Sequence, residues 1–297
     1  MGDIAVDYIS TGYLDKHLGK SMDQYDARIV MGMVTGHLVI HDDGIPLLQL
    51  RSTVLFRQLQ HLDLTGIWNV KILILPYLEQ IKRLEIQDGG YFPEYSLNID
   101  FPLTHTVEYL SLNSVYSWML GRTFKALREV RIGLLSFAIK NLARYEGLQV
   151  DLPACTILHF RGRPIDWLRF LSCSNLLNFH CWQGFSFGFG LTASNLLRDF
   201  LSTLSCLQNI YIFVIQGLGT DPLIDFVFYG ALEKGIWRDI RSVEMKVEFD
   251  SSSEASDFIE KTVRQQRYGK WWKTFITERR DGTMVGKMNR VIFTASM

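Results

Sequence analysis

The sequence predicts an α/β solenoid, in which short repeats each add one strand to a curved parallel sheet and helices or turns cover the convex side. Three observations lead to this fold class. A turn-and-strand pattern of apolar residues recurs, its copies are spaced for stacking, and no proline-, glycine- or serine-rich linker divides the chain. A stacked core also suits the length, because 297 residues are many for one compact core.

Each copy of the pattern is an apolar residue, two others, apolar, two others, apolar, one, apolar. The three-residue spacing fits a helical or 3₁₀ turn that buries one side, and the two-residue spacing fits a strand that buries alternate side chains. Successive copies lie about 20 to 33 residues apart, a spacing that brackets the period of leucine-rich repeats. We therefore interpret the copies as leucine-rich repeats of an irregular type.

A strand is expected in each copy, at the point where the two-residue spacing begins. The predicted strands are 61–65, 83–87, 109–113, 129–133, 157–161, 178–182, 209–213 and 242–247. A candidate ninth copy holds Val285, Met288, Val291 and Phe293. Segments of helical character lie between strands, at 191–204 and 221–234. Strand and helix in alternation predict parallel strands joined by right-handed crossovers.

The two ends of the chain differ from the repeats. Residues 1–50 do not fit the pattern well and are interpreted as an N-terminal cap, although 28–34 and 37–40 are apolar enough for strands. Residues 51–297 are interpreted as the solenoid, continuous with the cap as one domain. Near the C-terminus, 251–268 is the clearest helix, because a serine cluster and Glu254 match a capping box.

The charge balance and the cysteines limit which classes of binding partner and which cellular compartment are expected. Lys+Arg and Asp+Glu number 31 each, so no overall positive charge draws the chain to nucleic acid or anionic lipid. No apolar run approaches the roughly 20 residues of a membrane span, and no signal peptide pattern opens the chain. The four cysteines stand among apolar residues without disulfide or metal spacing, as buried residues of a reducing compartment do. A cytoplasmic or nuclear protein is expected.

A family resemblance covers roughly residues 50–297. The phrases that carry it are LPYLEQIKRLEI, FPLTHTVEYLSL, FKALREVRI, LPACTILHFRG, CSNLLNFHCW, LSCLQNIYIF and IWRDIRSVEM. They resemble the leucine-rich-repeat region of fungal F-box proteins, which likewise lack the fixed asparagine of regular repeats. The resemblance implies substrate recognition for a cullin-type ubiquitin ligase, whose adaptor would be docked by an F-box. No F-box opening phrase precedes Pro46, the first proline, which suggests a truncated product or a relative without that element.

Candidate chemical sites are scattered along the chain, and we expect no enzyme, cofactor or metal. His159 and His180 occupy the same strand position in consecutive copies, so their imidazoles are expected about 5 Å apart and could share a metal. No third ligand has a matching register, which favours two polar residues on a binding face. The glycines of 183–190 lack a phosphate-binding Gly-Lys-Ser/Thr ending and indicate an aromatic loop. Trp271 and Trp272 are expected to close the end of the solenoid.

The residues between the inward apolar positions of each strand are expected to face a partner. Arginine and aromatic residues dominate affinity in protein interfaces. The predicted partner-binding residues on the concave face are Arg131, His159, Arg161, His180, Trp182 and Tyr211. The sequence therefore predicts a protein-binding repeat protein that selects substrates for an F-box/cullin-type ligase. The alternatives are a plain scaffold without ligase contact and, less favoured by the residues, an enzyme with dispersed catalytic groups.

Overall fold

The fold was obtained as a computed structural model of the full chain. The structure describes residues 9–10, 37–41, 60–65, 80–87, 103–112, 119–133, 147–161, 168–183, 190–232, 234–249, 251–264 and 289–296. The chain forms two compact units. The first comprises 1–155 with 170–172, and the second comprises 156–169 with 173–297. Both units contain parallel strands, and the described helices are few, so the fold is mixed α/β with a mostly parallel sheet.

The first unit contains parallel strands that pair in chain order. They are β1 (Ile9–Ser10), β2 (His37–His41), β3 (His61–Thr65), β4 (Arg83–Gln87), β5 (Tyr109–Leu112) and β6 (Glu129–Ile132). A short helix, α3 (Leu103–Thr106), precedes β5. A separate small ladder pairs β7 (Val150–Asp151) with β9 (Leu171–Ser172) in parallel.

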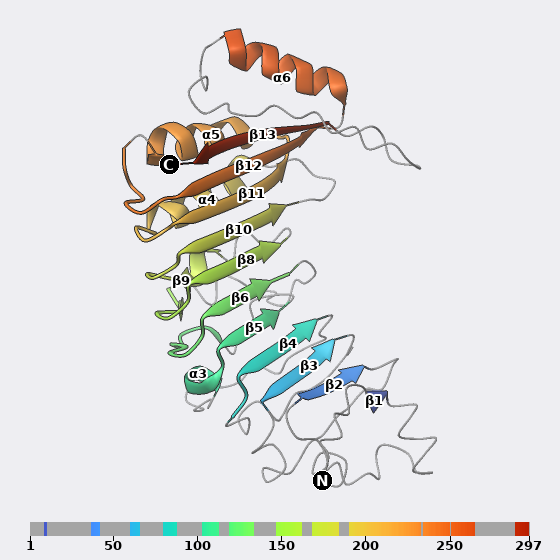
Figure 1. The fold of residues 1–297 in the computed structure, drawn as a ribbon, viewed down its shortest axis with the longest axis vertical. Helices are drawn as coiled ribbons and strands as arrows, with labels where there is room; N and C mark the ends of the chain where they lie inside the picture. The colour runs from blue at the N-terminus through green and yellow to red at the C-terminus, as the bar shows by residue number, and fades with distance from the viewer. Residues whose placement is uncertain are drawn as a thin grey trace. The chain divides into compact units, whose positions relative to one another are not determined.

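The second unit also pairs its strands in chain order, as Figure 1 shows. The parallel strands are β8 (Ile157–Arg161), β10 (Asn178–Gln183), β11 (Asn209–Ile215) and β12 (Ser242–Phe249). A last strand, β13 (Asn289–Ser296), pairs antiparallel with β12. The helical elements are α4 (Leu191–Ser202), α5 (Thr220–Asp225), the π-helical η7 (Phe226–Leu232) and α6 (Ser252–Arg264).

Alternation along each strand separates an inward apolar face from an outward face. In the first unit the inward residues Leu84, Leu110 and Val130 are aligned in register and fully buried. In the second unit the same holds for Leu158 and Phe179, which are also paired in register and fully buried. Because side chains in a strand alternate between faces, the residues between these positions lie on the outward face.

In both units the entries to several parallel strands share one hydrogen-bonding pattern. In the first unit the Gln60 carbonyl accepts the amides of both Lys82 and Arg83, at 2.8 and 2.9 Å, and the Lys82 and Glu108 carbonyls each accept an equivalent pair. In the second unit the carbonyls of Thr156, Leu177 and Gln208 do the same for the next strand entry. The carbonyl before each strand thus fixes how the following strand begins, which keeps successive strands in register.

Helices cover the inward face of the second unit, and aromatic contacts fix them there. Phe200 of α4 lies 5.7 Å from Phe179 of β10 between ring centroids. Phe258 of α6 lies 5.2 Å from Phe249 of β12 in the same measure. The indole N–H of Trp237, 2% exposed, donates to the Leu201 carbonyl at 3.2 Å and ties the segment before β12 to α4. The burial of these large rings stabilises the unit mainly through the hydrophobic effect.

The predicted strands are confirmed, with ends that shift by at most two residues. All are present as β3 to β6, β8 and β10 to β12, and each pairing described within a unit is parallel except that of β13. The candidate ninth copy does form a strand, but β13 runs antiparallel to β12. Alternating apolar residues are buried in the same way whether a strand pairs parallel or antiparallel. The sequence pattern therefore does not distinguish the two strand directions.

The predicted helices are confirmed as α4, the continuous α5 and η7, and α6. The serine half of the predicted capping box is present, since the Glu254 amide donates to Ser251 Oγ at 3.2 Å. Residues 37–40 lie in β2 as expected, whereas 28–34 and the boundary at residue 50 lie outside the described residues. Contacts divide the chain near residue 155 instead. A cap of 1–50 joined to the solenoid as one domain stays a prediction.

The cysteines have free thiols and differ in burial. Cys155, Cys173 and Cys181 are buried, as expected for small apolar residues, but Cys206 is only half-buried. Cys206 follows Ser205 in the bend before β11, and its Sγ lies 3.8 Å from Ser205 Oγ. The interpretation of all the cysteines as buried is therefore wrong for Cys206. Burial raises the pKa of the Cys181 thiol to about 12.

Candidate binding surface

A row of imidazole and phenol rings crosses the outward face of the second unit. His159 on β8, His180 on β10 and Tyr211 on β11 are direct partners in the parallel register. The His159 and His180 rings stack with centroids 4.5 Å apart and an interplanar angle of 21°. The His180 ring lies 6.1 Å from the Tyr211 ring. Register alone produces this row, because parallel pairing sets equivalent side chains beside one another.

A second row lies two residues further along the same strands. Arg161, Trp182 and Phe213 are register partners on β8, β10 and β11. The Arg161 guanidinium carbon lies 4.4 Å from the Trp182 ring centroid, a cation–π contact. Trp182 in turn stacks on Phe213 at 5.8 Å and 17°. Phe213 is only 4% exposed although it faces outward, which the indole stacked on it helps to explain.

A third row consists of hydrogen-bonded polar side chains at the beginning of the strands. Asn209 Nδ2 donates to Asn178 Oδ1 at 2.7 Å, and Ser242 Oγ donates to Asn209 Oδ1 at the same distance. The Asn209 amide thereby bridges β10 and β12. Both amide groups have fixed orientations, and this row orders the edge of the surface where the strands begin.

The β12 end of the surface has a paired cation. Lys246 Nζ lies 3.0 Å from Glu244 Oε1 and 5.3 Å from the Tyr211 ring centroid. Burial lowers the pKa of Lys246, but the hydrogen bond to Glu244 and the charges of Tyr211 and Glu244 outweigh it, and the net pKa is raised. Lys246 is therefore charged at neutral pH and neutralised by Glu244.

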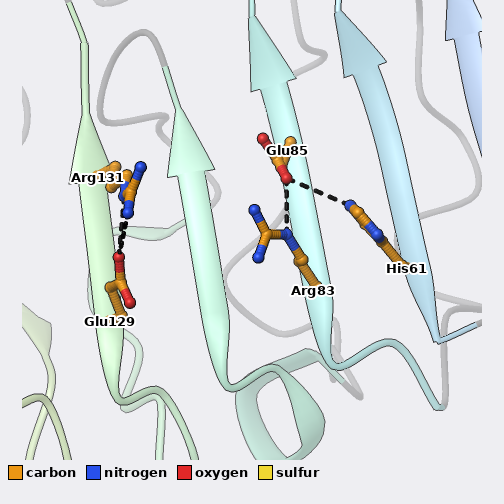
Figure 2. Close-up of polar contacts among 5 residues, drawn as sticks. All are labelled: His61, Arg83, Glu85, Glu129 and Arg131. Carbon is orange, nitrogen blue, oxygen red and sulfur yellow. Dashed lines mark hydrogen bonds and ion pairs between the residues drawn. The ribbon is translucent and has the colours of Figure 1, made fainter.

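The outward face of the first unit is built mainly from ion pairs. Figure 2 shows Glu85 on β4 shared by two neighbours: Arg83 Nε donates to Glu85 Oε1 at 2.7 Å, and His61 Nε2 lies 3.2 Å from the same oxygen. Arg131 Nε donates to Glu129 on its own strand at 2.9 Å. The charges of Arg83 and Glu85, and those of Arg131 and Glu129, are therefore paired within this face.

Tyr109 lies between the two arginines of that face. Its ring centroid is 3.9 Å from the Arg83 guanidinium carbon and 5.5 Å from that of Arg131. Burial, as the largest cause, raises the pKa of the Tyr109 phenol. Burial lowers the pKa of Arg83, but the hydrogen bond and charge of Glu85 raise it overall. Both arginines are thus fixed by an aromatic ring and a carboxylate.

The six predicted partner-binding residues divide between the two units. His159, Arg161, His180, Trp182 and Tyr211 lie together on β8, β10 and β11 of the second unit. Arg131 lies on β6 of the first unit, with Tyr109 and Glu129 as its neighbours. We name the five residues of the second unit, with Phe213, the aromatic surface.

Phe213 is the residue that the sequence analysis missed. Phe213 stands two residues after Tyr211 and therefore points outward with it. Strict alternation counted from Asn209 would have found it. Trp271 and Trp272, expected to close the solenoid, lie outside the described residues, as do 184–189 of the glycine-rich stretch.

The stacked imidazoles are poorly arranged to share a metal ion. A metal lies near the plane of each imidazole that binds it, about 2 Å from the nitrogen. The His159 and His180 planes are inclined by only 21° and stack face to face, so they do not converge near the nitrogens. Within the described ranges, no group of three His, Cys, Asp or Glu residues could hold a metal ion.

Comparisons with known proteins found no match for the chain. No family model matches it, and no curated protein or solved structure shows significant similarity. None of the helices in the described parts of the chain has the length and apolar character to cross a bilayer.

Proposed function

We propose that this chain binds a protein partner through the aromatic surface of its second unit. The observation that carries the proposal is the continuous series of ring and cation contacts from Arg161 through Trp182 to Phe213, beside the His159, His180 and Tyr211 row. Side chains that already support one another lose little conformational freedom on binding, which lowers the cost of association. Tryptophan, tyrosine and arginine are also the residues that dominate protein interfaces.

The proposal includes a finer description of the fold as a solenoid of irregular leucine-rich repeats. The repeated strand-entry hydrogen bonds and the aligned buried rows within each unit support it. In such a solenoid the aromatic surface would belong to the concave side. A concave row of parallel strands suits an extended segment of a partner, because neighbouring strands lie about 4.8 Å apart and a few residues span several of them.

A binding role is favoured over catalysis by the state of the reactive groups. Burial and the raised pKa of Cys181 make that thiol a poor nucleophile at neutral pH. On the aromatic surface the His159 and His180 imidazoles stack on each other, an arrangement that differs from the hydrogen-bonded base and nucleophile of covalent catalysis. We therefore propose a protein that is not an enzyme and needs no cofactor, in the cytoplasm or nucleus where free thiols persist.

Two biological roles use such a surface, and one experiment separates them. Substrate recognition for a cullin-type ubiquitin ligase follows from the resemblance to fungal F-box proteins, and a plain scaffold needs only the surface itself. The tagged chain is purified from the cells that naturally produce it, and the purified material is probed for the ligase adaptor. Recovery of the adaptor assigns the ligase role, and partners recovered without it assign the scaffold role.

The binding proposal is tested with Trp182→Ala and Tyr211→Ala, singly and together. Partners captured by the wild-type chain are expected to be lost from the double variant, with an intermediate loss for each single change. Tyr109→Ala in the first unit is the matched control, because it also removes an aromatic ring beside an arginine. Thermal unfolding checks that all variants fold. Equal recovery of all partners by the double variant and the control would refute the proposal.

A further inference from the structure

Among the outward-facing cations on strands whose side chains the structure describes, only Arg161 lacks a carboxylate two residues away. Arg83 pairs with Glu85, Arg131 with Glu129 and Lys246 with Glu244, at 2.7, 2.8 and 3.0 Å. At Arg161 the residue two positions earlier is His159. Within the described part of the chain Arg161 is exposed, and no carboxylate forms an ion pair with it. Its charge is therefore not neutralised there.

Trp182 orders the exposed guanidinium without neutralising it. The guanidinium carbon lies 4.4 Å from the indole centroid, and the indole stacks on Phe213. A guanidinium held over a ring keeps the N–H groups at its edge available, and their fork matches the two oxygens of a carboxylate. Arg161 is thus placed to bind an anion before a partner arrives.

The surroundings of Arg161 favour an anionic group. The outward residues with described side chains on β8 and β10 are Ile157, His159, Arg161, Asn178, His180 and Trp182, and they include no carboxylate. Glu244 on β12 is already paired with Lys246. The imidazoles of His159 and His180 each carry a ring N–H donor in either tautomer. The potential above β8 and β10 therefore favours negative charge.

We propose that Arg161 binds a carboxylate side chain of the partner, which presents an extended acidic segment across β8 and β10. This inference rests on the proposed function and adds the chemistry of the partner to it. The carboxylate accepts two hydrogen bonds from the guanidinium, and flanking residues of the segment contact Trp182 and the histidine row. Recognition of this kind is specific because a neutral residue in place of the acid leaves the guanidinium unpaired.

The test selects peptides from a random displayed library on the immobilised full chain. Selected peptides are synthesised, and their affinities are measured for the wild type and for Arg161→Gln, Arg161→Lys and Arg83→Gln. Each acidic residue of a selected peptide is also replaced by its amide. Arg83 is the control arginine, since it lies over Tyr109 in the first unit and is already paired. Each peptide bound to the immobilised wild type is also challenged with free Trp182→Ala protein. A peptide that this variant does not remove is one that binds the aromatic surface.

Peptides rich in Asp or Glu are expected, with binding reduced about tenfold or more by Arg161→Gln, partly restored by Arg161→Lys and unchanged by Arg83→Gln. Replacement of the acidic peptide residue by its amide should not weaken binding to the Arg161→Gln variant any further. Peptides that need Trp182 but show no acidic enrichment would overturn the inference and leave the proposed function standing. A library without binders to this surface would overturn it as well.

Discussion

The His159 and His180 rings stack 4.5 Å apart across β8 and β10, directly beside the contact between His180 and Tyr211. His180 is thus the central member of a row in which each ring has a neighbour on the adjacent strand. Cross-strand pairs of this type stabilise a sheet by roughly 0.2–1 kcal/mol each. The row therefore contributes to the stability of the sheet as well as to the proposed recognition.

Replacement of His180 separates the ring contacts from the imidazole chemistry. His180→Ala removes both neighbours' contacts and is expected to lower the free energy of unfolding by about 1 kcal/mol. His180→Phe keeps a flat ring and should cost less than about 0.5 kcal/mol. Urea denaturation of both variants measures the difference. Equal losses for alanine and phenylalanine would mean that the stacked rings contribute nothing.

The aligned inward residues predict large losses on truncation. Leu110→Ala in the first unit and Leu158→Ala in the second each remove a fully buried side chain. Each is expected to lower the free energy of unfolding by about 2–5 kcal/mol, since a cavity remains between neighbouring strands. Chemical denaturation measures this. Arg161→Ala is the control on β8, where an exposed residue should cost under about 0.5 kcal/mol.

The inward half of each strand could be predicted because its signal is local. Apolar spacing identifies Leu158 or Phe179 as buried without knowledge of any neighbour, and the structure confirms both. The rows on the outward face depend on the register between strands. Because the parallel repeats share one pattern, this register could be predicted for His159 and His180. Most of the aromatic surface could therefore be predicted from the sequence.

What could not be predicted depends on contacts between side chains. Among the described residues Arg161 has no carboxylate partner, whereas Arg131 is paired with Glu129, and this difference depends on the positions of side-chain atoms, not only on their strands. The direction of β13 is similarly absent from an alternation pattern. Burial of the outward Phe213 needed the knowledge that a neighbouring indole covers it. Each of these features is a product of tertiary packing.

Because two neighbours share the carboxylate of Glu85, we expect even a conservative substitution of Glu85 to lower the stability of the fold. Glu85→Gln keeps the shape but removes the charge that pairs with Arg83 and lies beside His61. Because Arg83 is 45% exposed, solvent screening limits the expected loss to about 1 kcal/mol. Thermal unfolding at low and high salt measures it. A loss that does not diminish with salt would assign the effect to packing instead of charge.

The buried Cys181 thiol leads us to expect that the free energy of unfolding declines in alkaline solution. The pKa of Cys181 is raised from 9.0 to about 12 in the folded protein, so the unfolded state releases its proton first as the pH rises. The stability from this group is complete below pH 9.0 and is lost progressively as the pH approaches 12. Cys181→Ala should flatten this part of the stability curve. Denaturation across that pH range measures the difference.

Thiol labelling provides a second measurement of the same property. At neutral pH the half-buried Cys206 should react with a disulfide reagent in the native protein, whereas Cys155, Cys173 and Cys181 should react only after unfolding. Cys206→Ser is the control that removes the fast reaction. Rapid labelling of Cys181 under native conditions would contradict its burial beneath the sheet.

The last prediction concerns the pair on which recognition is proposed to depend. Arg161→Ala with Trp182→Ala removes the cation and the ring that orders it. The double variant should weaken capture of the natural partner by at least about 2 kcal/mol, as expected for a central arginine and tryptophan in an interface. Folding should change little, because Arg161 is exposed and Trp182 is only half-buried. Quantitative affinity purification measures the loss, with Arg83→Ala and Tyr109→Ala combined as the matched pair in the first unit. If the double variant recovers the same partners at full strength while changes at Trp271 and Trp272 abolish them, the partner binds near the C-terminus and the aromatic surface is not the site.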